Sequence, residues 1–160
     1  GGAGADILHG GADADTFTFA SSSESAASVA ANTTVTFDDI TDFKANSNND
    51  EINLDAVGSI DFAANATATV TTASVANVAT FSALESAIET AISGQIVAST
   101  SSAAQVYDVK LTGSGLAAAG VERLVIVNDG DTAISASDLM IELSGTSASA
   151  ILGSNIDFTA

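Results

Sequence analysis

The sequence opens with two consecutive nine-residue units, GGAGADILH and GGADADTFT, each with Gly-Gly at its start and Asp at its sixth place. Glycine adopts positive φ without a Cβ clash, so each unit favours a tight turn with carbonyl oxygens pointing inward. Asp6 and Asp15 add carboxylates beside those carbonyls, and this is the oxygen ligand set of calcium. The apolar residues after each aspartate predict a short strand. Two surface turns without function are the alternative interpretation.

The unit is similar to the calcium-binding nonapeptide GGxGxDxUx of RTX (repeats-in-toxin) proteins. That resemblance implies a parallel β-roll, in which loops two repeats apart close each calcium site. The partner of the first loop is therefore expected before Gly1, in a longer RTX protein. Asp13 stands where the repeat usually has Gly, a harmless change if only its carbonyl is used. The implied calcium ligands are glycine carbonyls and aspartate carboxylates in the two loops: Gly2, Gly4, Asp6, Gly11, Asp13 and Asp15.

A second part of the resemblance lies further along the chain. DDITDF at residues 38–43 and DEINLDAVG at residues 50–58 follow a Ser-rich stretch that has lost the repeat. This order resembles the end of the roll in serralysin-type and other RTX proteins, although Asn53 stands where that family usually has Asp and the intervening turn is longer. Where the repeats run out, Asp38 and Asp42 are predicted to close the last calcium site.

The charge balance narrows the possible partners. The formal net charge is −17, with only three basic residues. Nucleic acid is therefore disfavoured, because binding it requires neutralisation of phosphates. With no cysteine, no disulfide can stabilise the chain, and charge repulsion opposes the compact state unless cations bind. The charge also suits solubility of a secreted protein, and both explanations stay open.

Catalytic chemistry has little basis in this sequence. His9 is the single histidine, HExxH is absent, and there is no cysteine nucleophile. Paired carboxylates can hydrolyse glycosides, but the chain has no Trp and one Tyr to position a sugar. We therefore expect a protein that is not an enzyme. The sequence contains no run of eighteen apolar residues, so we expect no transmembrane helix.

The rest of the chain predicts a mostly β fold with one helix. An apolar stripe predicts the helix at residues 80–92, with a Ser82–Glu85 capping box and Gly94 as the stop. Strands are expected at residues 34–43, 51–55, 106–111, 122–127 and 138–143, and residues 62–77 predict a strand pair or a long edge strand. Asp129-Gly130 predicts a hairpin turn; a weak calcium site at Asp129, Asp131 and Asp138 is the alternative. The predicted organisation is the end of an RTX β-roll at residues 1–19, capped by a β-sandwich-like domain at residues 20–160.

The last residues and the composition suggest where the protein acts. Asp157 followed by apolar and small residues resembles the uncleaved C-terminal signal of type I secretion substrates. The Ala/Ser/Thr/Asn-rich, Lys-poor composition resembles surface-layer proteins. We expect a secreted or cell-surface calcium-binding module that uses the type I secretion machinery and belongs to a self-assembling surface array. The tail of a secreted RTX metalloprotease or lipase, or of an adhesin, is the alternative.

Overall fold

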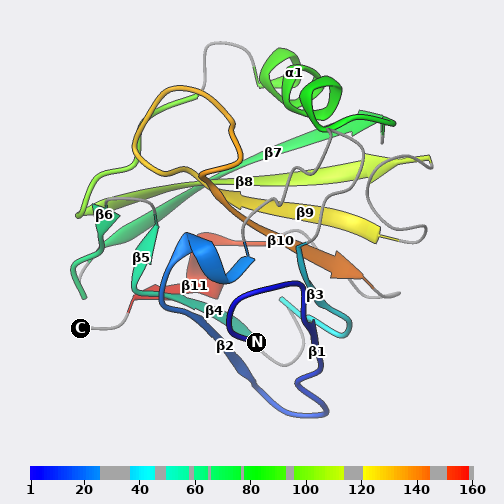
Figure 1. The fold of residues 1–160 in the computed structure, drawn as a ribbon. Coiled ribbons are helices and arrows are strands. Elements are labelled where there is room, and N and C mark those ends of the chain that lie inside the picture. Colours follow the sequence, from blue (N-terminus) through cyan, green and yellow to red (C-terminus); the bar gives the residue numbers. More distant parts are fainter. Residues whose placement is uncertain are drawn as a thin grey trace.

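A computed structural model describes residues 1–25, 37–45, 50–57, 60–64, 66–76, 78–92, 96–113, 121–144 and 151–158, with only the backbone at residues 121–122. These residues confirm a mostly β fold with one α-helix (Figure 1). The largest sheet has six strands. In spatial order they are β1 (Ile7–Leu8), β3 (Asp38–Ile40), β10 (Leu139–Ser144), β9 (Val121–Val127), β8 (Ala103–Thr112) and β7 (Thr67–Ala76).

A second sheet has three strands, β11 (Ile156–Phe158), β4 (Glu51–Leu54) and β2 (Thr16–Phe19), and both of its pairings are parallel. The first four strands alternate between the two sheets, because β1 pairs with β3 in parallel while β2 pairs with β4 in parallel. Each passage from one sheet to the other requires a turn. The second glycine-rich segment forms the turn between β1 and β2, and the first lies directly before β1. A small antiparallel pair, β5 (Ala56–Val57) and β6 (Ile60–Asp61), follows β4.

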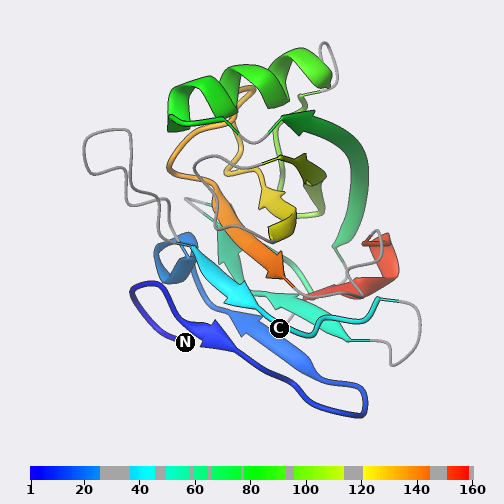
Figure 2. The same cartoon turned by 90° about the vertical axis from the view of Figure 1, so that its right-hand side faces the viewer.

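Two apolar clusters hold the elements together. The first lies between the sheets and includes Phe17 and Phe19 of β2, with the Phe62 and Phe158 rings 5.2 Å apart. The second lies on the other face of the large sheet, under helix α1 (Phe81–Ala91). Figure 2 shows α1 at one end of the molecule and β1 and β2 at the other. The glycine turns are thus remote from the helix.

The helix was placed correctly but its predicted cap is wrong. Thr80 is the N-cap, with extended backbone, and its hydroxyl accepts a hydrogen bond from Ala83 N at 3.3 Å. Ser82 lies inside the first turn, so the Ser82–Glu85 capping box does not form. Thr80 and Ser82 flank Phe81, the first residue of the apolar stripe, and the hydroxyl residue before it caps the helix. Gly94 lies outside the described residues.

Several strand predictions are refined by the structure. The strand expected at residues 34–43 is observed as β3, while residues 34–36 lie outside the described part. Residues 62–77 contain the ten-residue edge strand β7. β9 and β10 pair antiparallel as a hairpin would, but residues 128–138 join them, so Asp129-Gly130 does not make a tight two-residue turn. The predicted boundary at residue 19 stays a prediction; hydrogen-bonded sheets run across it.

Candidate metal centre

The first turn, residues 1–6, depends on glycine for its shape. Gly2 and Gly4 have φ of 101° and 128°, outside the range that most side chains tolerate. The Asp6 carboxylate folds back over Gly1, where an added β-carbon would come within 2.4 Å of Asp6 Oδ2. The turn therefore closes on its own aspartate, and β1 begins directly after it.

Asp38 lies one strand inward from the first turn. Its Oδ1 accepts a hydrogen bond from Asp6 N at 2.9 Å, and Asp39 N donates to Asp6 O at 2.9 Å. Asp38 N donates to the hydroxyl of Ser25, which in turn donates to the carbonyl of Met140. These contacts fix the backbone on both sides of the Asp38 carboxylate.

The second oxygen of Asp38 distinguishes this residue. The side chain is fully buried, and within the described residues Oδ2 has no hydrogen-bond partner. Burial raises the pKa of Asp38, and the nearby charges of Asp6 and Glu24 also raise it, while the hydrogen bond from Asp6 N and the charge of the Gly1 amino group act in the opposite direction. An ionised carboxylate with an unsatisfied oxygen is costly to bury, so a bound cation here would stabilise it.

The second turn, residues 10–15, repeats the backbone of the first. Gly11 has φ of 119°, and a β-carbon on Gly10 would lie 2.6 Å from Asp15 Oδ2. Asp15 Oδ2 is buried without a hydrogen bond among the described residues. Asp15 N donates to Asp50 Oδ1 at 3.2 Å, and Glu51 N donates to Asp15 O at 2.9 Å.

Asp42 binds the start of the second turn. Its two oxygens accept hydrogen bonds from Gly10 N at 3.0 Å and Gly11 N at 2.8 Å. Burial alone would raise the pKa of Asp42, but these two hydrogen bonds, with the charges of His9 and Lys44, outweigh it and lower the pKa. Both carboxylate oxygens of Asp42 are therefore engaged by backbone amides.

A basic side chain also reaches this turn. Lys44 Nζ donates to the Gly11 carbonyl at 2.9 Å, and Lys44 N donates to Asp50 Oδ2 at 2.8 Å. His9 is exposed, with Nδ1 3.2 Å from Asp42 Oδ2 and 3.1 Å from Thr41 Oγ1. Sequence reasoning did not identify Asp50 or Lys44. The signals available were the aspartate that opens DEINL and the scarcity of basic residues.

The predicted ligands fall into two groups rather than one site. Asp38, at the start of β3, meets the first turn, and Asp42, just after β3, meets the second. Asp13 is exposed on the second turn. Within the described residues, no three acidic or histidine side chains gather closely enough to hold a metal ion by themselves, and this includes Asp129, Asp131 and Asp138. A calcium ion at either turn would thus need backbone carbonyls for most of its ligands.

Calcium suits the two turns unequally. The first turn combines the Asp6 carboxylate, carbonyls of a glycine turn and the unsatisfied Asp38 Oδ2, an all-oxygen set of the kind that calcium prefers. In the second turn the Gly11 carbonyl is taken by an ammonium group and both Asp42 oxygens by amides. The donor set is compatible with calcium at the first turn. At the second turn it is depleted on the inner side, although the buried Asp15 Oδ2 has no hydrogen bond among the described residues.

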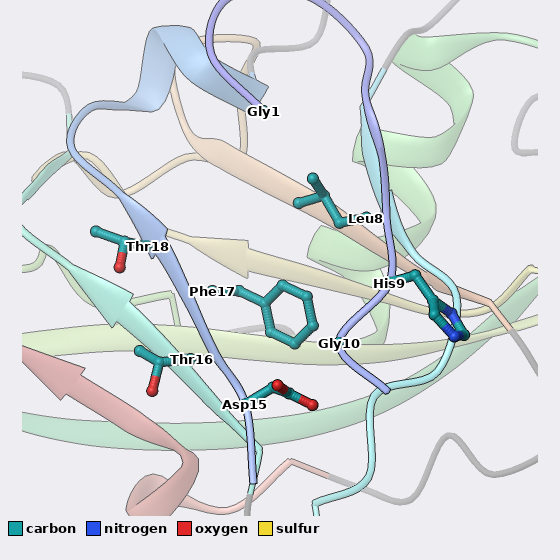
Figure 3. A pocket seen from close by; sticks show the side chains of 8 residues that line it. All are labelled: Gly1, Leu8, His9, Gly10, Asp15, Thr16, Phe17 and Thr18. Atoms are coloured by element: carbon teal, nitrogen blue, oxygen red, sulfur yellow. The ribbon is translucent and has the colours of Figure 1, made fainter. Parts of the chain in front are cut away.

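An open hollow of about 340 Å³ lies between β1 and β2, the outermost strands of their sheets. In Figure 3, Leu8 and Phe17 point toward one another across it, while His9 points away. Ile7 of β1 is 80% exposed. Apolar side chains are thus accessible at this end of the molecule.

No protein-family model, curated protein or solved structure matches this chain. In the part of the chain that the structure describes, no helix has the length and apolar character that crossing a membrane requires.

Proposed function

We propose that this chain is a calcium-binding module of the RTX type from a secreted bacterial protein, and that it is not an enzyme. The observation that carries the proposal is the first turn. There a tight glycine turn and the Asp6 carboxylate lie against Asp38, whose buried oxygen has no hydrogen bond among the described residues. Residues of the first turn and Asp38 would hold the ion, which would supply the positive charge that this group of oxygens lacks.

The strand arrangement supports the finer proposal of a β-roll end. Parallel strands that alternate between two sheets, with a glycine turn between β1 and β2, are what stacked nonapeptide repeats would produce. The edges of β1 and β2 and the hollow between them would accept a further pair of parallel strands. Such a pair would cover the exposed Ile7 and the hollow that Leu8 and Phe17 line.

Calcium-triggered folding and type I secretion form the second part of the proposal. A chain of charge −17 without cysteine gains stability from bound cations, and loses it where calcium is scarce. The C-terminal strand β11 pairs with β4, and Phe158 packs on Phe62. A secretion signal at residues 157–160 would therefore be accessible to the secretion machinery before folding.

We propose a surface-layer or other self-assembling structural protein as the parent. The edge strand β7 supports this choice, because its ten residues carry no charged side chain and, among the described strands, it pairs only with β8. Its other edge is of the kind to which another strand can add. The tail of a secreted enzyme is the alternative. Imaging the native assembly on cells with and without calcium distinguishes them, since an ordered array that disperses on chelation supports the structural parent.

Calcium titration calorimetry tests the binding proposal. Asp6→Asn removes one carboxylate of the first turn and should weaken calcium binding by about tenfold or more, the loss of one charged ligand contact. Asp13→Asn is the matched control, because it removes the same charge from an exposed side chain and leaves the backbone carbonyl in place. A wild-type chain that takes up no calcium at millimolar concentration would contradict the proposal.

A further inference from the structure

The second turn already carries a cation of its own. All three basic side chains lie within the described residues, and they have different environments. Lys110 is exposed on β8, and Arg123 Nη1 binds both oxygens of the buried Asp108 at 2.7 and 2.8 Å. Lys44 is half-buried and places its ammonium 2.9 Å from the Gly11 carbonyl. One of the three basic side chains of the protein thus binds the second turn.

The Lys44 ammonium lies between the second turn and the chain that follows β3. Gly11 belongs to the second turn, and Lys44 lies between Asp42 and Asp50, which both contact the same turn. Asp42 and Asp50 bring two carboxylates to the turn and accept its amide protons. Lys44 adds one positive charge and satisfies a carbonyl, which are the two contributions that calcium makes in an oxygen site.

The first turn offers the matched comparison. It also turns at glycines of positive φ and has an equivalent inward carboxylate in Asp38. Lys44 binds the second turn, whereas the positive charge that acts on Asp38 is that of the Gly1 amino group. Both oxygens of Asp42 are hydrogen-bonded, while one oxygen of Asp38 is unsatisfied within the described residues. Asp15 of the second turn also keeps one unsatisfied buried oxygen, so the contrast concerns the two inward carboxylates, Asp38 and Asp42.

We propose that the Lys44 ammonium is a tethered cation that replaces calcium between the second turn and the pair Asp42 and Asp50, so that this turn closes without metal. Its corollary, that only the first turn requires calcium, rests on the proposed function. The part concerning Lys44 does not. A lysine at this place makes the last turn of the stack independent of the calcium supply.

Amide hydrogen exchange of the 160-residue chain, measured residue by residue in calcium and in chelator, tests this inference. The reporting amides are Gly10, Gly11 and Asp15, all of which donate at the second turn. Lys44→Met keeps most of the apolar stem and removes the charge, and should lower their protection in chelator by about tenfold, as loss of a charge-assisted hydrogen bond predicts. Lys44→Arg should retain most of the protection. Lys110→Met removes an exposed charge elsewhere and should change nothing at the turn.

The outcomes separate the two proposals. In wild type, protection at the second turn that falls in chelator no more than that of the β9 amides, with a further loss in Lys44→Met, supports the tethered cation. Unchanged protection in Lys44→Met, or wild-type protection at the second turn that falls in chelator more than that of the β9 amides, overturns it. If Lys44→Met does not fold, which the amides of β9 report, the wild-type comparison alone decides. If the protection of the Asp6 amide is the same in calcium and in chelator, the result contradicts the proposed function and leaves the Lys44 proposal standing.

Discussion

The two glycine turns have a similar shape and differ in how their charge is balanced. Gly2 and Gly4 of the first turn and Gly11 of the second have positive φ. Each turn has an aspartate folded back on its first glycine and meets a carboxylate from the segment that contains β3. At the first turn Asp38 is buried with an unsatisfied oxygen and a raised pKa. At the second, Asp42 is fully hydrogen-bonded, Lys44 binds the turn, and the pKa of Asp42 is lowered.

This difference indicates that a repeat sequence can determine the shape of a turn without determining whether calcium or a lysine ammonium balances its charge. Glycine spacing determines the backbone, because only glycine accepts those φ values without strain. The cation requirement depends on residues about thirty positions later, which approach through the parallel pairing of β1 with β3 and of β2 with β4.

Removal of calcium should have the largest effect. A ligand that binds only the folded state adds about 2.7 kcal/mol at a hundredfold excess over its dissociation constant. For a domain of this size that corresponds to a fall in melting temperature of roughly 5–10 °C in chelator. Circular dichroism should show β signal recovered when calcium returns. An identical spectrum and melting temperature in chelator would remove the distinction between the turns.

Asp138 should give a pH dependence that is unrelated to either turn. Burial raises its pKa to about 7, against hydrogen bonds from Ser135 N and Asp129 N, and Asp129 and Asp131 add like charge. The folded state therefore binds the Asp138 proton more tightly than the unfolded state does. Its stabilising contribution is complete below about pH 4 and is lost as pH rises to about 7, at up to about 1.4 kcal/mol per pH unit.

Asp138→Asn isolates this contribution and sharpens the comparison of the turns. The difference in unfolding free energy between wild type and Asp138→Asn should decline from pH 4 to pH 7 and then level off. Urea denaturation at a series of pH values in chelator measures it. A difference that is constant over this range would show that Asp138 is not protonated in the folded protein, and comparisons of the turns could then be made at any pH.

Smaller and opposite effects are expected from Asp38→Asn and Asp42→Asn in chelator. Asp42→Asn loses an acceptor for the Gly10 and Gly11 amides and leaves Lys44 without a nearby charge, which should cost about 1–2 kcal/mol. Asp38→Asn removes a buried charge that has no cation, so its unfolding free energy should be unchanged or up to about 1 kcal/mol higher. In calcium Asp38→Asn should instead destabilise. Equal losses from both variants in chelator would contradict the difference between the turns.

Much of the fold could be predicted from the sequence, while the contacts at the turns could not. Alternating and apolar stretches located β8, β9 and β10, and the stripe through Leu84 and Ile88 located α1, because burial of these faces follows from their periodicity. The glycine spacing located both turns. The pairing of Asp42 with the second turn and not the first depends on the length of β3 and its register with β1, and neither is encoded in a local pattern. Lys44 was overlooked because its role requires a neighbour more than thirty residues away.

The most direct test of the unequal turns is a crystal structure of the chain grown in millimolar calcium, with anomalous scattering used to locate the ions. The account predicts anomalous density beside Asp6 and Asp38. At the second turn it predicts the Lys44 ammonium on the Gly11 carbonyl, beside Asp42 and Asp50. Density for calcium at that inner position, with Lys44 displaced into solvent, would contradict it, as would the absence of calcium beside Asp38.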